Sequence, residues 1–447
     1  MELVKRNRNA NKTKGDRKME QTSKKLWNKD FSLLVIGQIM SLFGNMVVTT
    51  VLPFHILNIS GSAFLYGLAM GLPVVSMIIM TPIGGIMADR FKKHRLMFWL
   101  DVGITTIIVG YMLINGLFYE VVPIVIVKLL AFNAIQAVYM ATTASSISLL
   151  APPEKLTTGN AVIMVVNMLS MTGGMAVAGI LYDRFGLFPI LIGCAVCFAV
   201  TAIADLFIRI PYVKQETTGS VAQIVKGDMT QSLRFVLKEK PTISRCIIPI
   251  FLMELVFGSM IMIGMPVLIT VHLGLSMTHV GVALAIMMFG GVVGAIVAGS
   301  LGTRLNIPNG FVFIIFGILC SVPMGLVLIF SVPQMLAYVV FVASGTIYVF
   351  AAKICSLAIM THIQVETPPE LIGKVLAVLM ILPFIGQSIG YPLQGWLFQE
   401  FVTTPWYVVF GAIAVMMLVA VTAYRYVKKS LVVRTIEQSD ITKREVN

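Results

Sequence analysis

The stretch GGIMADRFKKHR, residues 84–95, is the densest internal cluster of charge in this chain of 447 residues. It holds five side chains that are charged at neutral pH, whereas 57% of the chain is hydrophobic and only 12% is charged. The mean hydropathy is +0.91. Apolar runs flank the stretch on both sides, and a helix needs about 20 apolar residues to cross a bilayer. The composition therefore predicts a helical membrane protein with many spans.

Twelve apolar runs are long enough to be transmembrane helices. They lie near residues 31–56, 64–88, 97–118, 121–146, 159–181, 187–210, 244–270, 278–302, 309–330, 334–360, 373–397 and 404–426. The first run is longer than the apolar core of a signal peptide, so we expect it to be retained as a span.

The net charge of +13 is distributed by position rather than spread evenly. Most lysines and arginines lie at the two ends of the chain or in every second connection between spans. Positive residues remain on the cytoplasmic side during insertion, so this pattern predicts an even number of spans with both termini cytoplasmic. The charge thus indicates topology and contact with anionic lipid, and it argues against a nucleic-acid partner.

The longest internal connection, residues 211–242, divides the spans six and six. We therefore expect a basic tail (1–30), an N-terminal six-helix bundle (31–210), a linker (211–242), a C-terminal six-helix bundle (243–426) and a C-terminal tail (427–447). In the linker, apolar residues from Val225 to Val236 share one helical face. This spacing predicts a helix lying on the membrane surface, with a solvated linker helix as the alternative.

The two halves of the chain also repeat short motifs. PPEKL (152–156) precedes Gly179 in the first half as PPEL (368–371) precedes Gly395 in the second, at an offset of 216 residues. GIMADR (85–90) has a weaker counterpart in GSLGTR (299–304), at an offset of 214. Parallel six-span repeats that hold substrate between them are a transporter architecture. We therefore predict an all-α membrane protein with twelve helices in two pseudo-symmetric bundles.

The charged stretch matches most of a known motif, G-x-x-x-D-R-x-G-R-[RK]. The chain supplies Gly85, Asp89, Arg90 and Lys93 with Arg95 close by, while lysine replaces the second glycine. In this motif, and across residues 25–427, the chain resembles the major facilitator superfamily. The resemblance implies that Asp89 and Arg90 latch the two bundles together in the outward-open state, as part of a cytoplasmic gate. We expect Asp101, near the cytoplasmic start of span 3, to support this cluster.

Other segments resemble the bacterial twelve-span drug exporters of the macrolide-efflux type. These segments are WNKDFSLLVIGQIMSLFGN (27–45), LNISGSA (57–63), LLAPPEKLTTGNA (149–161) and SLRFVLKEKP (232–241). Two motifs of the family are incomplete here, because SMTGGMAVAG (170–179) lacks the antiporter proline and Lys128 stands near the usual arginine of span 4. The resemblance implies drug:proton antiport and drug resistance.

Three ionisable residues, Glu254, Lys128 and Lys353, lie within predicted spans. Each costs about 2.5–3.5 kcal/mol at a helix centre on insertion scales, so each requires a reason. The resemblance places them on cavity-lining spans 4, 7 and 10. We hypothesise that Glu254 couples transport to protons or recognises a cation, with an ion pair to either lysine as the alternative. Further polar residues expected to line the cavity are Gln38, Ser41, Asn45 and Gln136.

The sequence predicts a secondary active transporter that exports an amphipathic small molecule by proton antiport across a bacterial cell membrane. An importer or facilitator of a polar metabolite, or a non-transporting scaffold, would share the same spans. No metal-ligand cluster, nucleophile–base set or phosphate-binding glycine loop is evident in the sequence, so we expect neither an enzyme nor a cofactor. We also expect a monomer that is energised by a gradient rather than by an ATPase domain.

Overall fold

The computed structural model describes residues 26–117, 122–210, 248–330 and 332–446. Within them, eleven helices are long and apolar enough to cross a membrane, and α16 (Pro369–Glu400) completes the twelve that the sequence predicts. The others are α3 (Lys29–Ser60), α4 (Ala63–Arg90), α5 (Lys93–Leu117), α6 (Val122–Leu150), α7 (Leu156–Phe185), α8 (Leu187–Leu206), the seventh span (Ile248–His272), α12 (Met277–Leu301), α13 with α14 (Ile307–Leu319 and Val322–Ile329), α15 (Gln334–Glu366) and α17 (Trp406–Val446). The predicted linker 211–242 and residues 1–25 of the predicted tail lie outside the described residues.

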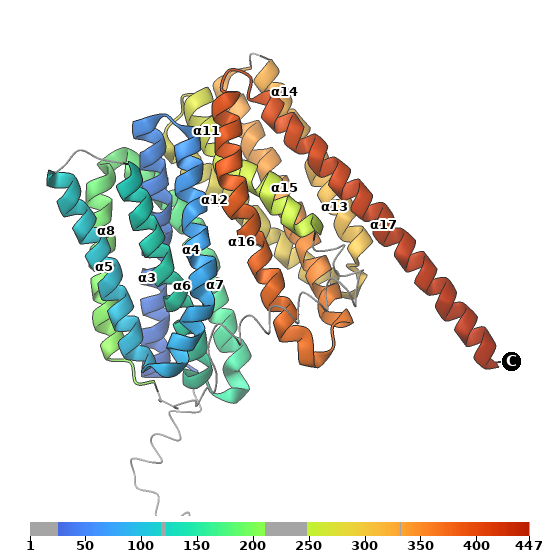
Figure 1. The fold of residues 1–447 in the computed structure, drawn as a ribbon, viewed down its shortest axis with the longest axis horizontal. Coiled ribbons are helices and arrows are strands. Elements are labelled where there is room, and N and C mark those ends of the chain that lie inside the picture. The colour runs from blue at the N-terminus through green and yellow to red at the C-terminus, as the bar shows by residue number, and fades with distance from the viewer. Residues whose placement is uncertain (1–25, 118–121, 211–247, 331, 447) are drawn as a thin grey trace, which may run out of the picture.

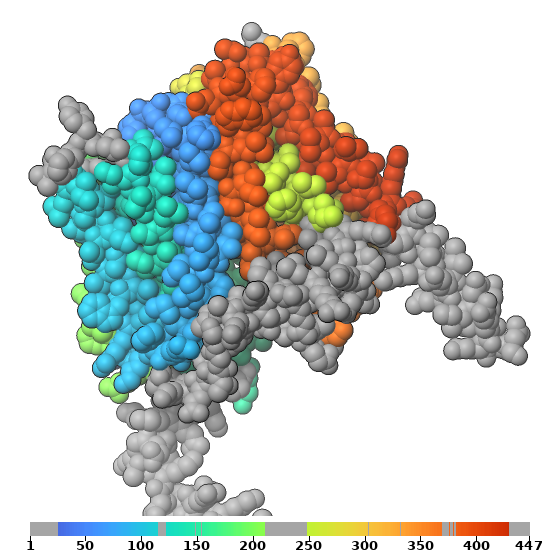
Figure 2. Space-filling model, viewed as in Figure 1, coloured from blue at the N-terminus to red at the C-terminus, as the bar shows by residue number. Residues whose placement is uncertain are grey.

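The helices form two bundles that follow each other along the chain (Figure 1). In the N-terminal bundle α4 packs on α6, α5 on α8, and α3 on both α7 and α8. In the C-terminal bundle α15 packs on α12 and α13, and α13 on α17. The bundles meet where α4 contacts α16 and where α7 contacts α12, and Figure 2 shows the first of these contacts on the facing surface.

Two ends of the molecule are distinguished by the turns that lie there. The clasp end contains the turns around residues 61–62, 186, 273–276 and 401–405 and lies at the top of Figure 1. The basic end contains the turns around residues 91–92, 151–155, 207–210, 302–306 and 367–368. The charged stretch 84–95 therefore lies at the basic end.

Local sequence explains where the first two helices begin and end. Asn28 caps α3, because its side chain accepts a hydrogen bond of 2.8 Å from the backbone N–H of Phe31. The same helix ends at Gly61, whose φ of +62° favours a residue without a β-carbon. Ser62 then caps α4 by accepting from the N–H of Leu65 at 3.2 Å. The segment 57–63 thus contains both the C-cap of α3 and the N-cap of α4.

The seventh span departs from regular α-helix. It contains three π-helical stretches, η3 (Met253–Gly258), η4 (Met260–Gly264) and η5 (Leu268–His272), with a short α-helical turn, α11 (Met265–Val267), between the last two. Wide turns of this kind occur mostly as single-turn bulges within α-helices, frequently at functional sites. The predicted run 309–330 is likewise interrupted, because it divides into α13 and α14 just before Pro323.

Small residues bring the helices of the C-terminal bundle close together. A β-carbon on Gly294 would overlap the carbonyl oxygen of Phe350, so α12 and α15 touch through their backbones. A β-carbon on Gly390 would likewise overlap the carbonyl oxygen of Leu255 in the seventh span. Small residues at these positions therefore allow the helix backbones to approach closely.

Candidate functional site

The carboxylate of Glu254 lies in the first π-helical stretch of the seventh span, in a half-buried position. The side-chain amide of Gln387, on α16, donates a hydrogen bond of 3.2 Å to its Oε2 atom. The backbone carbonyl of Glu254 accepts a hydrogen bond of 2.8 Å from the hydroxyl of Ser259. Glu254 is therefore held from two sides without being closed off completely.

The position of Gln387 depends on the glycines beside it. A β-carbon on Gly386 would lie 3.0 Å from the carbonyl oxygen of Phe251 and 3.2 Å from Cβ of Glu254. Larger residues at Gly386 and Gly390 would push α16 away and draw the amide of Gln387 out of reach. Glycine spacing on one helix thus sets the contact made by a carboxylate on another. Sequence reasoning singled out Glu254 but missed Gln387.

The two predicted lysine partners have different surroundings. Lys353 is exposed on α15, and its charge acts on Glu254, although no ion pair joins the two side chains. Lys128 is buried inside the N-terminal bundle, where its Nζ atom lies 3.5 Å from the ring centroid of Tyr111. Desolvated cations interact favourably with an aromatic face. Of the two lysines, Lys353 is the one whose charge acts on the carboxylate.

The polar residues predicted to line a cavity lie mostly inside the N-terminal bundle. Gln38 and Ser41 on α3 face α6, and the amide of Gln38 donates a bond of 3.1 Å to the hydroxyl of Thr143. Gln136 is 5% exposed, and neither of its amide atoms has a hydrogen-bond partner among the described residues. Asn45 is half-buried one turn beyond Ser41. In this conformation these groups belong chiefly to the bundle interior.

The predicted gate cluster is fastened to its own bundle by one lysine. Lys93 donates hydrogen bonds to the carbonyl of Ala88 at 2.8 Å and to the hydroxyl of Ser145, on α6, at 2.9 Å. Its ammonium lies 4.0 Å from the carboxylate of Asp89. The remaining predicted gate residues are a half-buried Gly85 and exposed Arg90 and Arg95. Asp101 forms no ion pair with this cluster, because its side chain points into the bundle and is fully buried.

The opposite end of the molecule carries a hydrogen-bonded clasp between the bundles, which sequence reasoning missed. Asp183, near the end of α7, accepts bonds from the backbone N–H groups of Met277 and Thr278, at 3.2 and 2.6 Å. It also accepts a bond of 2.5 Å from the hydroxyl of Thr278. These are the unpaired donors at the start of α12, so a carboxylate from one bundle caps a helix of the other. We call this contact the acidic clasp.

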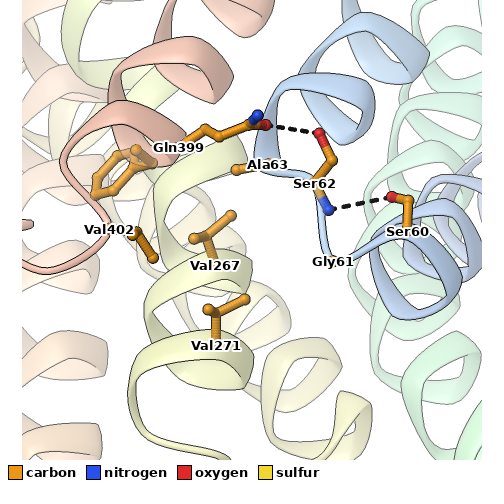
Figure 3. Close-up of a pocket in the computed structure, with 9 residues that line it drawn as sticks. Ser60, Gly61, Ser62, Ala63, Val267, Val271, Gln399 and Val402 are labelled. Atoms are coloured by element: carbon orange, nitrogen blue, oxygen red, sulfur yellow. Dashed lines mark hydrogen bonds between the residues drawn. The ribbon is translucent and has the colours of Figure 1, made fainter.

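A second clasp joins α16 to α4 and is visible in Figure 3. The side-chain oxygen of Gln399 accepts bonds of 2.6 Å from the hydroxyl of Ser62 and 3.1 Å from the N–H of Phe64. A small pocket opens beside this contact, walled by Val267 and Val271 of the seventh span. We call the contact between Gln399 and the start of α4 the neutral clasp.

The two clasps occupy equivalent positions in the repeated halves. The offset of 216 residues between Gly179 and Gly395 also relates Asp183 to Gln399. A β-carbon on Gly179 would overlap the carbonyl oxygen of Met277, and one on Gly395 would overlap that of Ala63. The duplication was therefore the signal in the sequence that could have located both clasps.

Comparison with known proteins assigns the architecture to a family. The model of the Major Facilitator Superfamily matches residues 34–390. The chain belongs to the major facilitator superfamily. Within the superfamily, it is 24% identical over 187 residues to macrolide efflux protein A of Streptococcus pyogenes. That match covers 41% of this chain and 46% of the relative, so the chain matches about half the length of that exporter.

Solved transporters of the same fold superimpose over most of the chain. The nucleoside transporter NupG covers 88% of it with a TM-score of 0.71 and 13% identity, over 98% of its own length. A bacterial homologue of the human lysosomal transporter Spinster, in an inward-facing conformation, covers 90% with a TM-score of 0.68 and 14% identity, over 97% of its length. A bacterial homologue of the iron transporter ferroportin, also inward-facing, covers 89% with a TM-score of 0.66 and 14% identity, over 98% of its length. These likenesses show that the chain has the fold of these transporters over most of its length.

Proposed function

We propose that this transporter exports amphipathic small molecules across the cell membrane by proton antiport, with its basic end in the cytoplasm. The observation that carries the proposal is the placement of Glu254. This half-buried carboxylate lies in a π-helical stretch and accepts a hydrogen bond from the amide of Gln387. The charge of Lys353 also acts on it. Such a group can take up and release a proton, and intramembrane ionisable residues in transporters mark ion and proton pathways.

The direction and the substrate class rest on two further observations. The partial match to a macrolide exporter favours efflux of a large, mostly apolar compound. The seventh span is mostly apolar around Glu254, with methionine at three positions between Met253 and Gly264, and polarizable methionines adapt to substrates of varied shape. A polar metabolite would require more hydrogen-bonding groups than this span offers.

The positive residues in or beside the described turns of the basic end, among them Lys92, Arg95 and Arg304, support a cytoplasmic location for that end. Both clasps and the glycine contacts between bundles lie at the clasp end. We therefore propose that the structure is closed toward the outside. On this assignment Asp89 and Arg90 would latch the bundles when the basic end closes, as in the alternating-access cycle expected of such repeats.

The test measures accumulation of ethidium and of a radiolabelled macrolide in cells that express the chain. We expect lower accumulation than in empty cells, reversal by a protonophore, and complete loss of the effect in Glu254→Gln. Glu400→Gln is the matched control, because it makes the same change at an exposed position at the end of α16 and should leave export intact. Wild-type export by Glu254→Gln would overturn the role of this carboxylate. Export that is insensitive to protonophore would overturn proton antiport.

A further inference from the structure

The N-terminal bundle contains two buried carboxylates that the transport site described above does not use. Asp101 lies on α5 and is 0% exposed, while Asp205 lies at the end of α8 and is 1% exposed. The helices α5 and α8 pack directly against each other. The two carboxylates are close enough for their charges to interact. They therefore form an acidic pair inside a membrane-spanning bundle.

Among the described residues, no cation compensates this pair. Neither side-chain oxygen of Asp101, nor Oδ2 of Asp205, accepts a hydrogen bond from any described residue. No described lysine, arginine or histidine forms an ion pair with either carboxylate. An isolated buried charge is strongly unfavourable, and two adjacent negative charges add mutual repulsion. The pair therefore requires a positive partner that this part of the chain does not supply.

The groups around the pair are hydroxyls and an amide rather than charged residues. Tyr139, 1% exposed on α6, is close enough to interact with both carboxylates. Gln38 and Ser41, on α3, flank the Tyr139 hydroxyl, and the fully buried Ser41 hydroxyl has no hydrogen-bond partner among the described residues. Tyr139 and the two aspartates are thus the titratable groups that α3, α5, α6 and α8 bring to this point.

The composition of this cluster distinguishes between the cations it could hold. Metal ions of the hard class take six or more oxygen ligands, several of them carboxylates. Among the described residues, no group of three or more acidic, histidine or cysteine side chains could hold a metal ion. A proton needs only one carboxylate oxygen, with a second oxygen to share it, as in carboxyl pairs that cannot both ionise. The cluster therefore matches a proton better than a metal.

We propose that Asp101 and Asp205 form a second proton site, which holds one proton within the N-terminal bundle. Asp101 lies eight residues after the start of α5, about 12 Å from the basic end at 1.5 Å per residue. The proton would exchange with that end, and Tyr139 lies close both to the pair and to Ser41 of α3. A role of this proton in driving export rests on the proposed function, whereas its presence on the pair does not.

The experiment records infrared spectra of the purified full-length protein in lipid nanodiscs at neutral pH. We expect a carbonyl band of a protonated carboxylic acid that shifts in heavy water and is lost in Asp101→Asn/Asp205→Asn. Glu254→Gln should retain this component of the band. Tyr139→Phe, which keeps the ring but removes the hydroxyl, should shift the frequency of the band without abolishing it.

Two results would overturn the inference. One is a wild-type spectrum that matches that of the folded double variant, which would mean that the pair carries no proton. The other is loss of the wild-type band on adding sodium or calcium, which would make the occupant a metal ion. If the double variant does not fold, a pH titration of the wild-type band against Tyr139→Phe decides the same question. Because Glu254→Gln tests export separately, failure of the export proposal leaves this spectral result unaffected.

Discussion

The acidic clasp and the neutral clasp are the same contact built twice with different chemistry. Each places a side chain near the C-terminal end of one helix on the N-terminal end of a helix in the other bundle. Asp183 accepts three hydrogen bonds at the start of α12, and Gln399 accepts two at the start of α4. The duplication therefore preserved the position of the contact but not its charge.

The two capped helices also differ in their own caps. Ser62, the residue just before α4, caps this helix with its own side chain, independently of Gln399. Ser276, at the equivalent start of α12, makes no cap bond and instead pairs its hydroxyl with His279 at 3.0 Å. Opening the clasp end would thus leave α12 uncapped but α4 still capped. The acidic clasp contributes more to the closed state than the neutral one.

The largest effect is expected where the two clasps are alike, at their glycines. Gly179→Val and Gly395→Val should each destabilise the closed clasp end by about 1–3 kcal/mol, because a side chain there would overlap the backbone of the facing bundle. Spin labels on Phe188→Cys and Thr403→Cys, after replacement of the native cysteines, would report the distance between bundles. Gly173→Val is the control, since a side chain there meets open space on the same helix. Unequal effects at the two glycines would contradict the shared geometry.

A smaller effect should separate the two clasps. Asp183→Ala removes three acceptor contacts from an otherwise uncapped helix, so we expect it to weaken the closed state by about 1–2 kcal/mol, the usual range for losing a helix cap. Gln399→Ala should lose only about 0.5–1 kcal/mol, typical of a neutral hydrogen bond, because Ser62 remains.

The same pair of spin labels measures both variants as a shift toward the longer distance. Arg184→Ala is the matched control for Asp183→Ala, being the next residue along the chain and exposed. If Gln399→Ala opened the clasp end as far as Asp183→Ala, the acidic and neutral clasps would stabilise the closed state equally, and the expected difference between them would be wrong.

The smallest effect comes from making the neutral clasp acidic. Gln399→Glu places a carboxylate at the N-terminus of α4, where the helix dipole favours negative charge by about 0.3–1 kcal/mol. We expect a larger closed population and a lower rate of turnover in vesicles. Because exposed electrostatic contacts are screened, the gain should decline as salt is raised. A more open clasp end in this variant would show that repulsion or desolvation outweighs the dipole.

Sequence patterns were sufficient for the architecture because the bilayer imposes it locally. Apolar length predicted the spans, and the repeat offset related Gly179 to Gly395 before their contacts were known. The motif that includes Asp89 and Arg90 predicted the family, which the match over residues 34–390 confirms. Each of these signals lies within a short segment or recurs at one fixed spacing.

The candidate site was less accessible, because its contacts join distant segments. Gln387 reaches Glu254 across 133 residues, and Asp183 reaches Thr278 across 95. The sequence also gave no local sign of π-helix in the seventh span, since methionine, isoleucine and valine suit α-helical and π-helical turns alike. The partner of a polar residue is set by tertiary packing, which one sequence does not record.

The wide turns of the seventh span allow a movement that rigid helices cannot make. A π-turn closes its hydrogen bond one residue later than an α-turn, and one residue corresponds to about 100° around an α-helix. If the stretch Met253–Gly258 tightened to α-helix, the residues before it would rotate relative to those after it by about that angle. Glu254 could then turn from Gln387 toward the opposite bundle while His272 and the clasp end stayed in place. The helix would act as a swivel within the membrane, separate from the rocking of the two bundles.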